Sequence, residues 1–261
     1  MNSTGWDDVG SGDPVVFLHS FPLDRRMWAA QTEALAASGF RAVTVDLPGF
    51  GETPLPPHTD PSLDVYVDHA LRVCDDLGLT SAVFVGLSLG GYVALRLAGR
   101  HPERVRALVL ADTRAGGDSP ETRAGRVVNM SLVRSRGTGA LVDKLAPHLL
   151  SPGAPASAQA QLVAQGGAQS PEGVAFALLA MRDRPDATVV LPRLTMPTLV
   201  LVGDLDKVTP PAEHRDLAAS LPSARYVELA DAGHLSNLER PDEFNAALLG
   251  FLHALDGRPV A

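Results

Sequence analysis

The chain has 261 residues, of which 45% are hydrophobic and 20% are charged, and this composition is typical of a globular protein with one large core. Its formal net charge of −8 at pH 7 provides no electrostatic footprint for nucleic acid or for an anionic membrane surface. The single cysteine, Cys74, cannot form an intramolecular disulfide and is typical of a reducing compartment.

The sequence also lacks the usual signals for export, membrane insertion and cofactor binding. Met1 to Gly5 carry neither a basic region nor an apolar run, so we expect no signal peptide. No apolar stretch approaches transmembrane length. No metal-ligand spacing and no phosphate-binding loop is present. We therefore predict a cytoplasmic protein that needs no metal or other cofactor and has no membrane or nucleic-acid partner.

The first part of the chain alternates short apolar runs with helical patterns. Residues 6–9 offer at most a short edge strand. The predicted strands cover residues 15–19, 41–46, 82–85 and 104–112, and the predicted helices cover residues 26–38, 63–77 and 92–98. This alternation predicts a mostly parallel, doubly wound α/β sheet whose reactive residues lie at the strand ends.

The alternation stops between residues 115 and 194. Helix-like stretches separated by Gly and Pro take its place, at residues 122–133, 139–150, 158–163 and 172–181. Strand patterns return at residues 197–203 and 225–229, and a helix over 241–252 follows. We interpret the insertion as a helical cap, with residues 1–114 as the first part of the α/β core, 115–194 as the cap and 195–261 as the second part of the core.

A glycine-flanked serine lies between the predicted strand 82–85 and the next helix, in Gly86-Leu87-Ser88-Leu89-Gly90-Gly91. A serine at such a strand-to-helix turn, with glycines two residues before and after it, is the pattern of a nucleophile elbow. The turn would expose the Ser88 hydroxyl above the sheet and aim the helix N-terminus at a developing oxyanion. Leu89, the residue after the nucleophile, is the expected first oxyanion donor. An ordinary serine in a glycine turn is the alternative interpretation.

A serine nucleophile needs a base, and that base needs an orienting group. His234 follows the last predicted strand directly and is the candidate base. The other histidines outside the first strand lack such a placement: we expect His69 on a helix surface, His214 in a helix, and His58, His101, His148 and His253 in loops or on helices.

Three aspartates are candidates for the orienting acid. Asp112 ends the strand after Ser88, and Asp204 and Asp206 follow the strand over residues 197–203. All three lie between Ser88 and His234 in chain order, as this architecture requires. Because an aspartate at a strand end can also cap a turn, position alone does not choose among them.

Taken together, five motifs resemble the α/β-hydrolase fold superfamily, in its branch of small cofactor-free esterases, lactonases and haloperoxidase-like perhydrolases. The resemblance covers residues 15–255, and the cap only in general character. The motifs are the oxyanion loop His19-Ser20-Phe21-Pro22, the loop Asp46-x-x-Gly49-x-Gly51-x-Thr53, the elbow Gly86-x-Ser88-x-Gly90-Gly91, the acid loop Gly203-x-x-Asp206-x-x-x-Pro210, and Gly233-His234.

The resemblance implies a role for each matching residue. In the acid loop it selects Asp206, four residues before the proline, over Asp204. It implies that the backbone N–H groups of Phe21 and Leu89 form the oxyanion hole. Two departures are visible: Ser20 stands where a glycine is usual, and the first hairpin of the fold is largely absent.

These residues predict a serine hydrolase that cleaves a small-molecule ester or lactone through an acyl-enzyme. A cofactor-free perhydrolase or haloperoxidase, or a hydrolase of C–C bonds, would use the same three residues. A non-catalytic ligand-binding member is the alternative from a different class. A serine at position 88, in place of an aspartate, excludes a dehalogenase or an epoxide hydrolase.

We expect the substrate pocket between the strand ends and the cap. Apolar residues next to the motifs would form one wall and Met181 the other, with core packing as the alternative for Trp28 and Met181; the wall residues are Phe21, Trp28, Leu89, Val208 and Leu235. Four arginines are candidates for binding a substrate carboxylate, or else are solvated: Arg114, Arg123, Arg126 and Arg182. The sequence does not choose between a neutral ester and an acidic lactone.

Overall fold

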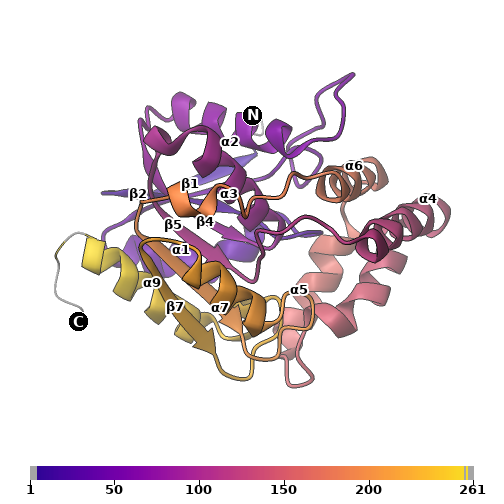
Figure 1. Cartoon of the computed structure of the whole chain (residues 1–261). Coiled ribbons are helices and arrows are strands. Elements are labelled where there is room, and N and C mark those ends of the chain that lie inside the picture. Colours follow the sequence, from indigo (N-terminus) through magenta and orange to yellow (C-terminus); the bar gives the residue numbers. More distant parts are fainter. Residues whose placement is uncertain (1–4, 256, 258–261) are drawn as a thin grey trace.

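The computed structural model describes residues 5–255 and 257, and within them seven strands form one sheet (Figure 1). The strand order is β1-β3-β2-β4-β5-β6-β7, and β1 runs antiparallel to β3 while the other described neighbours are parallel. The strands are β1 (Trp6–Gly10), β2 (Pro14–Leu18), β3 (Arg41–Val45), β4 (Ala82–Leu87), β5 (Val105–Ala111), β6 (Thr198–Gly203) and β7 (Ala224–Leu229). The predicted α/β class is confirmed. Residues 6–10 form an edge strand, where the sequence predicted at most a short strand over residues 6–9.

Helices cover both faces of the sheet because the strand side chains alternate between two apolar cores. In β2, Val16 and Leu18 belong to the core under α2 and α3, whereas Val15 and Phe17 belong to the core under α1 and α9. The helices outside the insertion are η1 (Arg25–Trp28), α1 (Ala29–Ala37), α2 (Leu63–Asp76), α3 (Leu89–Arg100), η2 (Pro102–Arg104), α7 (Pro211–Ala219), α8 (Ser236–Glu239) and α9 (Pro241–Leu255). The short helix η3 (Leu191–Arg193) lies inside the insertion, shortly before β6. Among the helices described, none combines the length and apolarity that crossing a bilayer requires.

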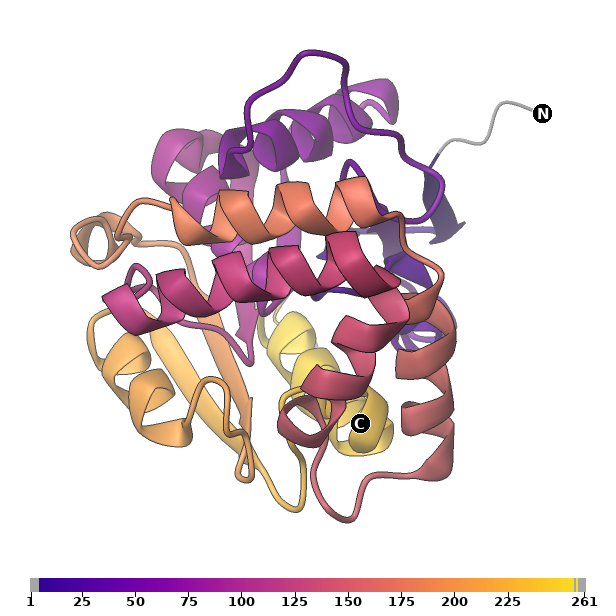
Figure 2. The same ribbon diagram turned by 90° about the vertical axis from the view of Figure 1, so that its right-hand side faces the viewer.

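Three helices, α4 (Pro120–Leu149), α5 (Ala156–Gly167) and α6 (Pro171–Arg182), fill the insertion between β5 and β6. Figure 1 shows them to one side of the sheet and its flanking helices, and Figure 2 shows α4 and α6 running side by side. The backbone of α4 breaks at Gly137, where φ is 79° and ψ is 173°. Only glycine adopts this conformation readily. Gly137 lies between the predicted helical stretches 122–133 and 139–150, so the break separates them.

The inserted helices pack on loops that follow the strands. A Cβ atom on Gly173, in α6, would lie 1.9 Å from the carbonyl oxygen of Gly49, in the loop after β3. The backbone N–H of His234, after β7, donates to the carbonyl oxygen of Leu149 at 3.0 Å. These contacts place the insertion over the carboxyl ends of the strands, where open α/β sheets carry their sites. The cap boundaries at residues 115 and 194 stay a prediction.

Candidate active site

The backbone turn at Ser88 has the strained form expected of an elbow. Ser88 joins β4 to α3 with φ 53° and ψ −109°, which is a conformation rarely adopted by a residue with a side chain. A Cβ on Gly86 would lie 2.2 Å from the Gly90 carbonyl oxygen, and one on Gly90 would lie 2.0 Å from that of Leu18. Glycine is therefore required on both sides of the serine, since β4, α3 and β2 approach within backbone contact.

Two hydrogen bonds link Ser88 to the loops after β6 and β7. The Ser88 Oγ atom lies 2.8 Å from His234 Nε2, and His234 Nδ1 lies 2.8 Å from Asp206 Oδ2. Asp206 fixes the imidazole tautomer with the proton on Nδ1, because a carboxylate accepts and does not donate. Nε2 is then free to accept the serine proton. The three predicted residues thus lie together in the order that a nucleophile, a base and an orienting acid require.

Burial and charge shift the pKa values of this group. Burial acts to lower the pKa of His234, but the charge and hydrogen bond of Asp206 outweigh burial and hold that pKa above its ordinary value. Burial acts to raise the pKa of Asp206, and the charge and hydrogen bond of His234 outweigh it and lower that pKa. Each residue thereby favours the charged form of the other, which suits a base that must carry a proton during a reaction.

The acid loop holds Asp206 with hydrogen bonds that the sequence analysis did not include. The Asp206 Oδ1 atom accepts the backbone N–H groups of Val208 at 2.7 Å and Thr209 at 2.9 Å. The Thr209 hydroxyl donates to Oδ2 at 2.7 Å. Asp204, the rejected alternative, instead accepts the N–H of Ala232 at 3.3 Å and makes no contact with His234 among the hydrogen bonds described. The three donors around Asp206 stabilise its ionised form.

Asp112, the other alternative acid, is fully buried at the end of β5. Its Oδ1 accepts the N–H of Gly203 at 3.0 Å, and its Oδ2 accepts the N–H and the hydroxyl of Ser236 at 3.2 and 2.5 Å. Burial, and secondly the charge of Asp206, raise the pKa of Asp112. Asp112 therefore ties the end of β6 to the segment after His234 without bonding to the imidazole.

Two residues that the sequence analysis passed over support the elbow from behind. Thr113 donates its hydroxyl hydrogen to the Ser88 carbonyl oxygen at 2.9 Å, and its backbone N–H donates to His214 Nε2 at 2.8 Å. Burial lowers the pKa of His214 to about 4, so the ring is neutral and can accept. His69, expected on a helix surface, is instead half-buried, and burial lowers its pKa to about 4. The spacing of these residues in the sequence does not indicate that Thr113 contacts Ser88 and His214.

The two expected oxyanion donors come from different parts of the chain, and Leu89 follows Ser88 directly. The N–H of Leu89 is in the first turn of α3, where backbone N–H groups have no acceptor within the helix. Phe21 lies in the loop after β2. There the Ser20 carbonyl oxygen accepts the Leu23 N–H at 2.9 Å and His19 Nδ1–H at 3.0 Å. Ser20 thus accommodates a tight turn in the absence of glycine.

Comparison with known proteins places the chain in a family. A family model described as the alpha/beta hydrolase fold matches residues 13–241. The chain belongs to the alpha/beta hydrolase fold family. It is similar to a thermophilic esterase from Thermogutta terrifontis, with 38% identity, coverage of 96% of this chain and 93% of the esterase, and a TM-score of 0.92.

Two further relatives of this hydrolase have different activities. The enol-lactonase from Burkholderia xenovorans LB400 is 31% identical over 95% of each chain, with a TM-score of 0.85. The 2-hydroxymuconate semialdehyde hydrolase of a Pseudomonas species is 30% identical and covers 99% of this chain and 93% of its own. The protein is therefore an α/β-fold hydrolase with esterase, lactonase and C–C hydrolase relatives, and hydrolases of this kind act on small molecules.

Trp28, Met181 and Leu235, three of the residues predicted to form the substrate pocket, are buried in the apolar cores. Trp28 is fully buried in the hydrolase core, with its ring centroid 5.1 Å from that of Phe17 in β2 and 6.0 Å from that of Phe244 in α9. These contacts match the alternative of core packing, because the indole fills the layer between the sheet and α9. A contact of Trp28 with substrate stays a prediction. Met181 and Leu235 are also buried in apolar clusters. Their contact with substrate, like those of Phe21, Leu89 and Val208, stays a prediction.

Each arginine considered for a substrate carboxylate already has an acidic partner. Arg114 Nε lies 3.1 Å from Glu213, and its Nη2 donates to the Val208 carbonyl oxygen. Arg126 pairs with Asp118, and both Arg123 and Arg182 pair with Asp183. Each of these guanidinium groups therefore forms an ion pair within the protein. Over residues 5–255 and 257, no cluster of three or more His, Cys, Asp or Glu side chains has the arrangement of a metal site.

Proposed function

We propose that the protein is a serine hydrolase that cleaves carboxylic esters or lactones through an acyl-enzyme intermediate. The observation that carries the proposal is the pair of 2.8 Å contacts from Ser88 Oγ to His234 Nε2 and from His234 Nδ1 to Asp206 Oδ2. Ser88 itself lies in a strained turn at the N-terminus of α3. A hydroxyl with an oriented base and a helix N-terminus beside it is equipped to attack a carbonyl carbon.

In the first step, Ser88 Oγ forms a bond to the substrate carbonyl carbon while His234 Nε2 takes the hydroxyl proton. The carbonyl π electrons move to the oxygen, where the N–H groups of Leu89 and Phe21 would stabilise the negative charge. Asp206 stabilises the imidazolium that forms. The C–O bond to the leaving alcohol then breaks, and His234 returns the proton to that oxygen. One such oxyanion donor contributes roughly 3 kcal/mol to catalysis in comparable sites.

In the second step, water attacks the acyl carbon and His234 takes its proton. The bond between the acyl carbon and Ser88 Oγ breaks, the acid departs and the serine is protonated again. A lactone follows the same path, but its alcohol and acid remain parts of one product. Burial supports this chemistry, since Ser88, Asp206 and His234 are 7%, 4% and 1% exposed. In such a buried site a fixed hydrogen bond stabilises a developing charge more strongly than it would in water.

The test is hydrolysis of a series of p-nitrophenyl esters of increasing acyl length, and of simple lactones, by wild type and by Ser88→Ala. We expect hydrolysis by the wild type and a loss in kcat of at least about 10⁴-fold in the variant. Residual activity near that of the wild type would exclude Ser88 as the nucleophile. Peroxide-dependent halogenation and cleavage of a chromogenic dienoate by the same samples test the perhydrolase and C–C hydrolase alternatives. Binding of esters without turnover would indicate the non-catalytic alternative.

A further inference from the structure

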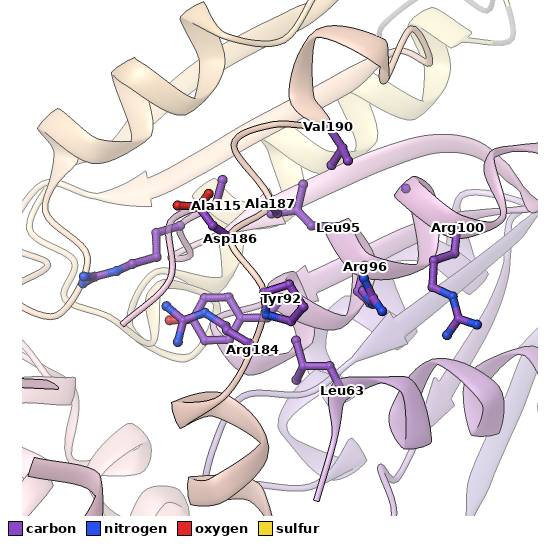
Figure 3. A pocket seen from close by; sticks show the side chains of 13 residues that line it. Leu63, Tyr92, Leu95, Arg96, Arg100, Ala115, Arg184, Asp186, Ala187 and Val190 are labelled. Carbon is purple, nitrogen blue, oxygen red and sulfur yellow. The ribbon is translucent and has the colours of Figure 1, made fainter. Parts of the chain in front are cut away.

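A cavity of about 80 Å³ lies beside α3 and does not include the proposed catalytic residues among its lining (Figure 3). It is bounded by the first residue of α2, by α3, and by the two segments that join the inserted helices to the sheet. These two segments are tied together, since the Ala187 N–H donates to the Ala115 carbonyl oxygen at 2.9 Å. The cavity therefore lies at the junction between the inserted helices and the core.

The middle of this junction cavity is apolar. Leu63, Leu95, Ala187 and Val190 line it, and Figure 3 shows Ala187 and Leu95 on one side and Leu63 on the other. One water molecule requires about 10–15 Å³. The cavity is several times larger, so it has room for a small ligand with a short hydrocarbon body.

One end of the junction cavity carries a surplus positive charge. Arg96 donates from Nε and Nη2 to Asp64 at 2.7 and 2.9 Å, and Arg100 Nη1 lies 2.7 Å from the same carboxylate. Two guanidinium groups thus share one negative charge. The Nη1 of Arg96 and the Nη2 of Arg100 take no part in these contacts, so both can donate to another acceptor. The side chains are 33% and 40% exposed, so they are accessible to a small ligand.

The opposite end of the cavity is electrically balanced. Arg184 lies against the ring of Tyr92 and, together with Arg126, pairs with Asp118. Asp186 lines the cavity here and adds a second carboxylate, so two positive charges meet two negative ones. The remaining lining arginine, Arg114, has an acidic partner of its own. The net charge of the lining and its partners is therefore one positive charge, located at the end formed by Arg96 and Arg100.

We propose that the junction cavity is a binding site for a small aliphatic monocarboxylate, separate from the catalytic site. The carboxylate binds Arg96 and Arg100, where charge-assisted hydrogen bonds are available and the protein supplies too few acceptors. The hydrocarbon chain lies among Leu63, Leu95 and Val190. A bound ligand would contact both α3, which begins next to Ser88, and the segment that leads out of the inserted helices. The site adds a ligand-binding function to the hydrolase and does not depend on the proposed reaction.

The experiment is calorimetric titration of pentanoate, which has seven non-hydrogen atoms, into wild type and variants. Arg100→Gln removes the surplus charge, and we expect it to weaken binding about fivefold or more. Ala187→Leu fills the apolar middle, and we expect it to abolish measurable binding. Arg215→Gln, which alters an exposed ion pair with Glu228 outside the cavity, is the matched control and should bind pentanoate as the wild type does.

Pentanamide, which has the same shape but no charge, should bind at least about fivefold more weakly than pentanoate. Equal affinity of wild type, Arg100→Gln and Ala187→Leu would overturn the proposal, because pentanoate would then bind elsewhere, including at Ser88. Equal binding of pentanamide and pentanoate would overturn the assignment of an anion. No step of the titration requires hydrolysis, so a failed esterase assay and a failed titration are separate results. If Arg100→Gln does not fold, Arg96→Gln makes the same test.

Discussion

The ends of β5 and β6 each carry a buried aspartate close to His234, and the two carboxyl groups have opposite properties. Asp206, after β6, bonds directly to the imidazole, and its pKa lies below the ordinary value. Asp112, after β5, bonds to Gly203 and Ser236, and its pKa lies above the ordinary value. Burial acts to raise both pKa values, so the difference comes from the partners.

This difference shows why strand-end position alone could not identify the acid. A carboxylate next to an imidazole gains a charged partner, whereas one held by neutral donors has only hydrogen bonds to offset its desolvation. Two neighbouring carboxylates also disfavour ionisation of each other, and the one without the imidazole is left with the raised pKa. The geometry thus favours Asp206 as the orienting acid of the proposed reaction and a structural role for Asp112.

The largest expected effect that separates the two aspartates is that of Asp206→Asn. An amide in place of Oδ2 would favour the wrong imidazole tautomer and remove the charge that stabilises the imidazolium. We expect kcat to fall about 10⁴-fold, with little change in the fold because the Asn side chain retains the shape. Steady-state kinetics on an activated ester measure this. A loss below about tenfold would show that another group orients His234.

The second expected effect is in the pH dependence of wild type. His234 must be neutral at Nε2 to accept the serine proton, and its folded-state pKa lies above the ordinary value of 6.5. We therefore expect kcat/KM to fall about tenfold for each pH unit below a midpoint higher than 6.5. A pH–rate profile gives this midpoint. A midpoint well below 6.5 would contradict the stabilisation of the imidazolium by Asp206.

The smallest expected effect on rate is that of Asp112→Asn, since Asp112 bonds to neither Ser88 nor His234. We expect kcat to change by no more than about tenfold, equivalent to about 1.4 kcal/mol of barrier. A much larger loss, comparable to that of Asp206→Asn, would mean that the two aspartates act as one unit.

The same Asp112→Asn variant should change the pH dependence of stability. A carboxyl whose pKa is raised in the folded state stabilises the fold fully below its unfolded pKa, and this contribution is lost as pH rises through the folded pKa. The ordinary pKa for Asp112 is 3.8 and the folded value is higher, so the contribution of this carboxyl group to the free energy of unfolding should decline as pH rises above 3.8. Denaturant titrations at several pH values measure this contribution. As pH rises, the free energy of unfolding of the wild type should fall relative to that of Asp112→Asn.

The sequence predicted the parts of the site that depend on local backbone geometry. Gly86 is required by a backbone contact with Gly90 within the elbow, and Gly90 by a backbone contact with Leu18 in β2, so the glycine pattern around Ser88 marks the close approach of β4, α3 and β2. The strand ends that carry Asp206 and His234 follow from short apolar runs. The choice of Asp206 over Asp204 came only from resemblance to a family, because it depends on an imidazole that is brought close by the packing of β7.

The contacts that depend on distant parts of the chain could not be predicted. Trp28 lies a few residues after the oxyanion loop in sequence, yet it packs against Phe244, more than two hundred residues away. The same holds for the hydrogen bond from Thr113 to His214. In the insertion the sequence predicted helices from helix-like stretches separated by Gly and Pro, and α4, α5 and α6 lie over these stretches. The sharing of Asp64 by two arginines in the junction cavity required the three-dimensional structure.

The most direct test of the central claim, that Ser88 is a nucleophile activated by His234, is covalent labelling with a fluorophosphonate. The Ser88 oxygen would bond to phosphorus, fluoride would leave and His234 would take the proton. Intact mass and peptide mapping of the wild type should show one adduct, on the peptide that contains Ser88, and His234→Gln should react at least about 10²-fold more slowly. The absence of an adduct on wild type, or an adduct on another residue, would contradict the account.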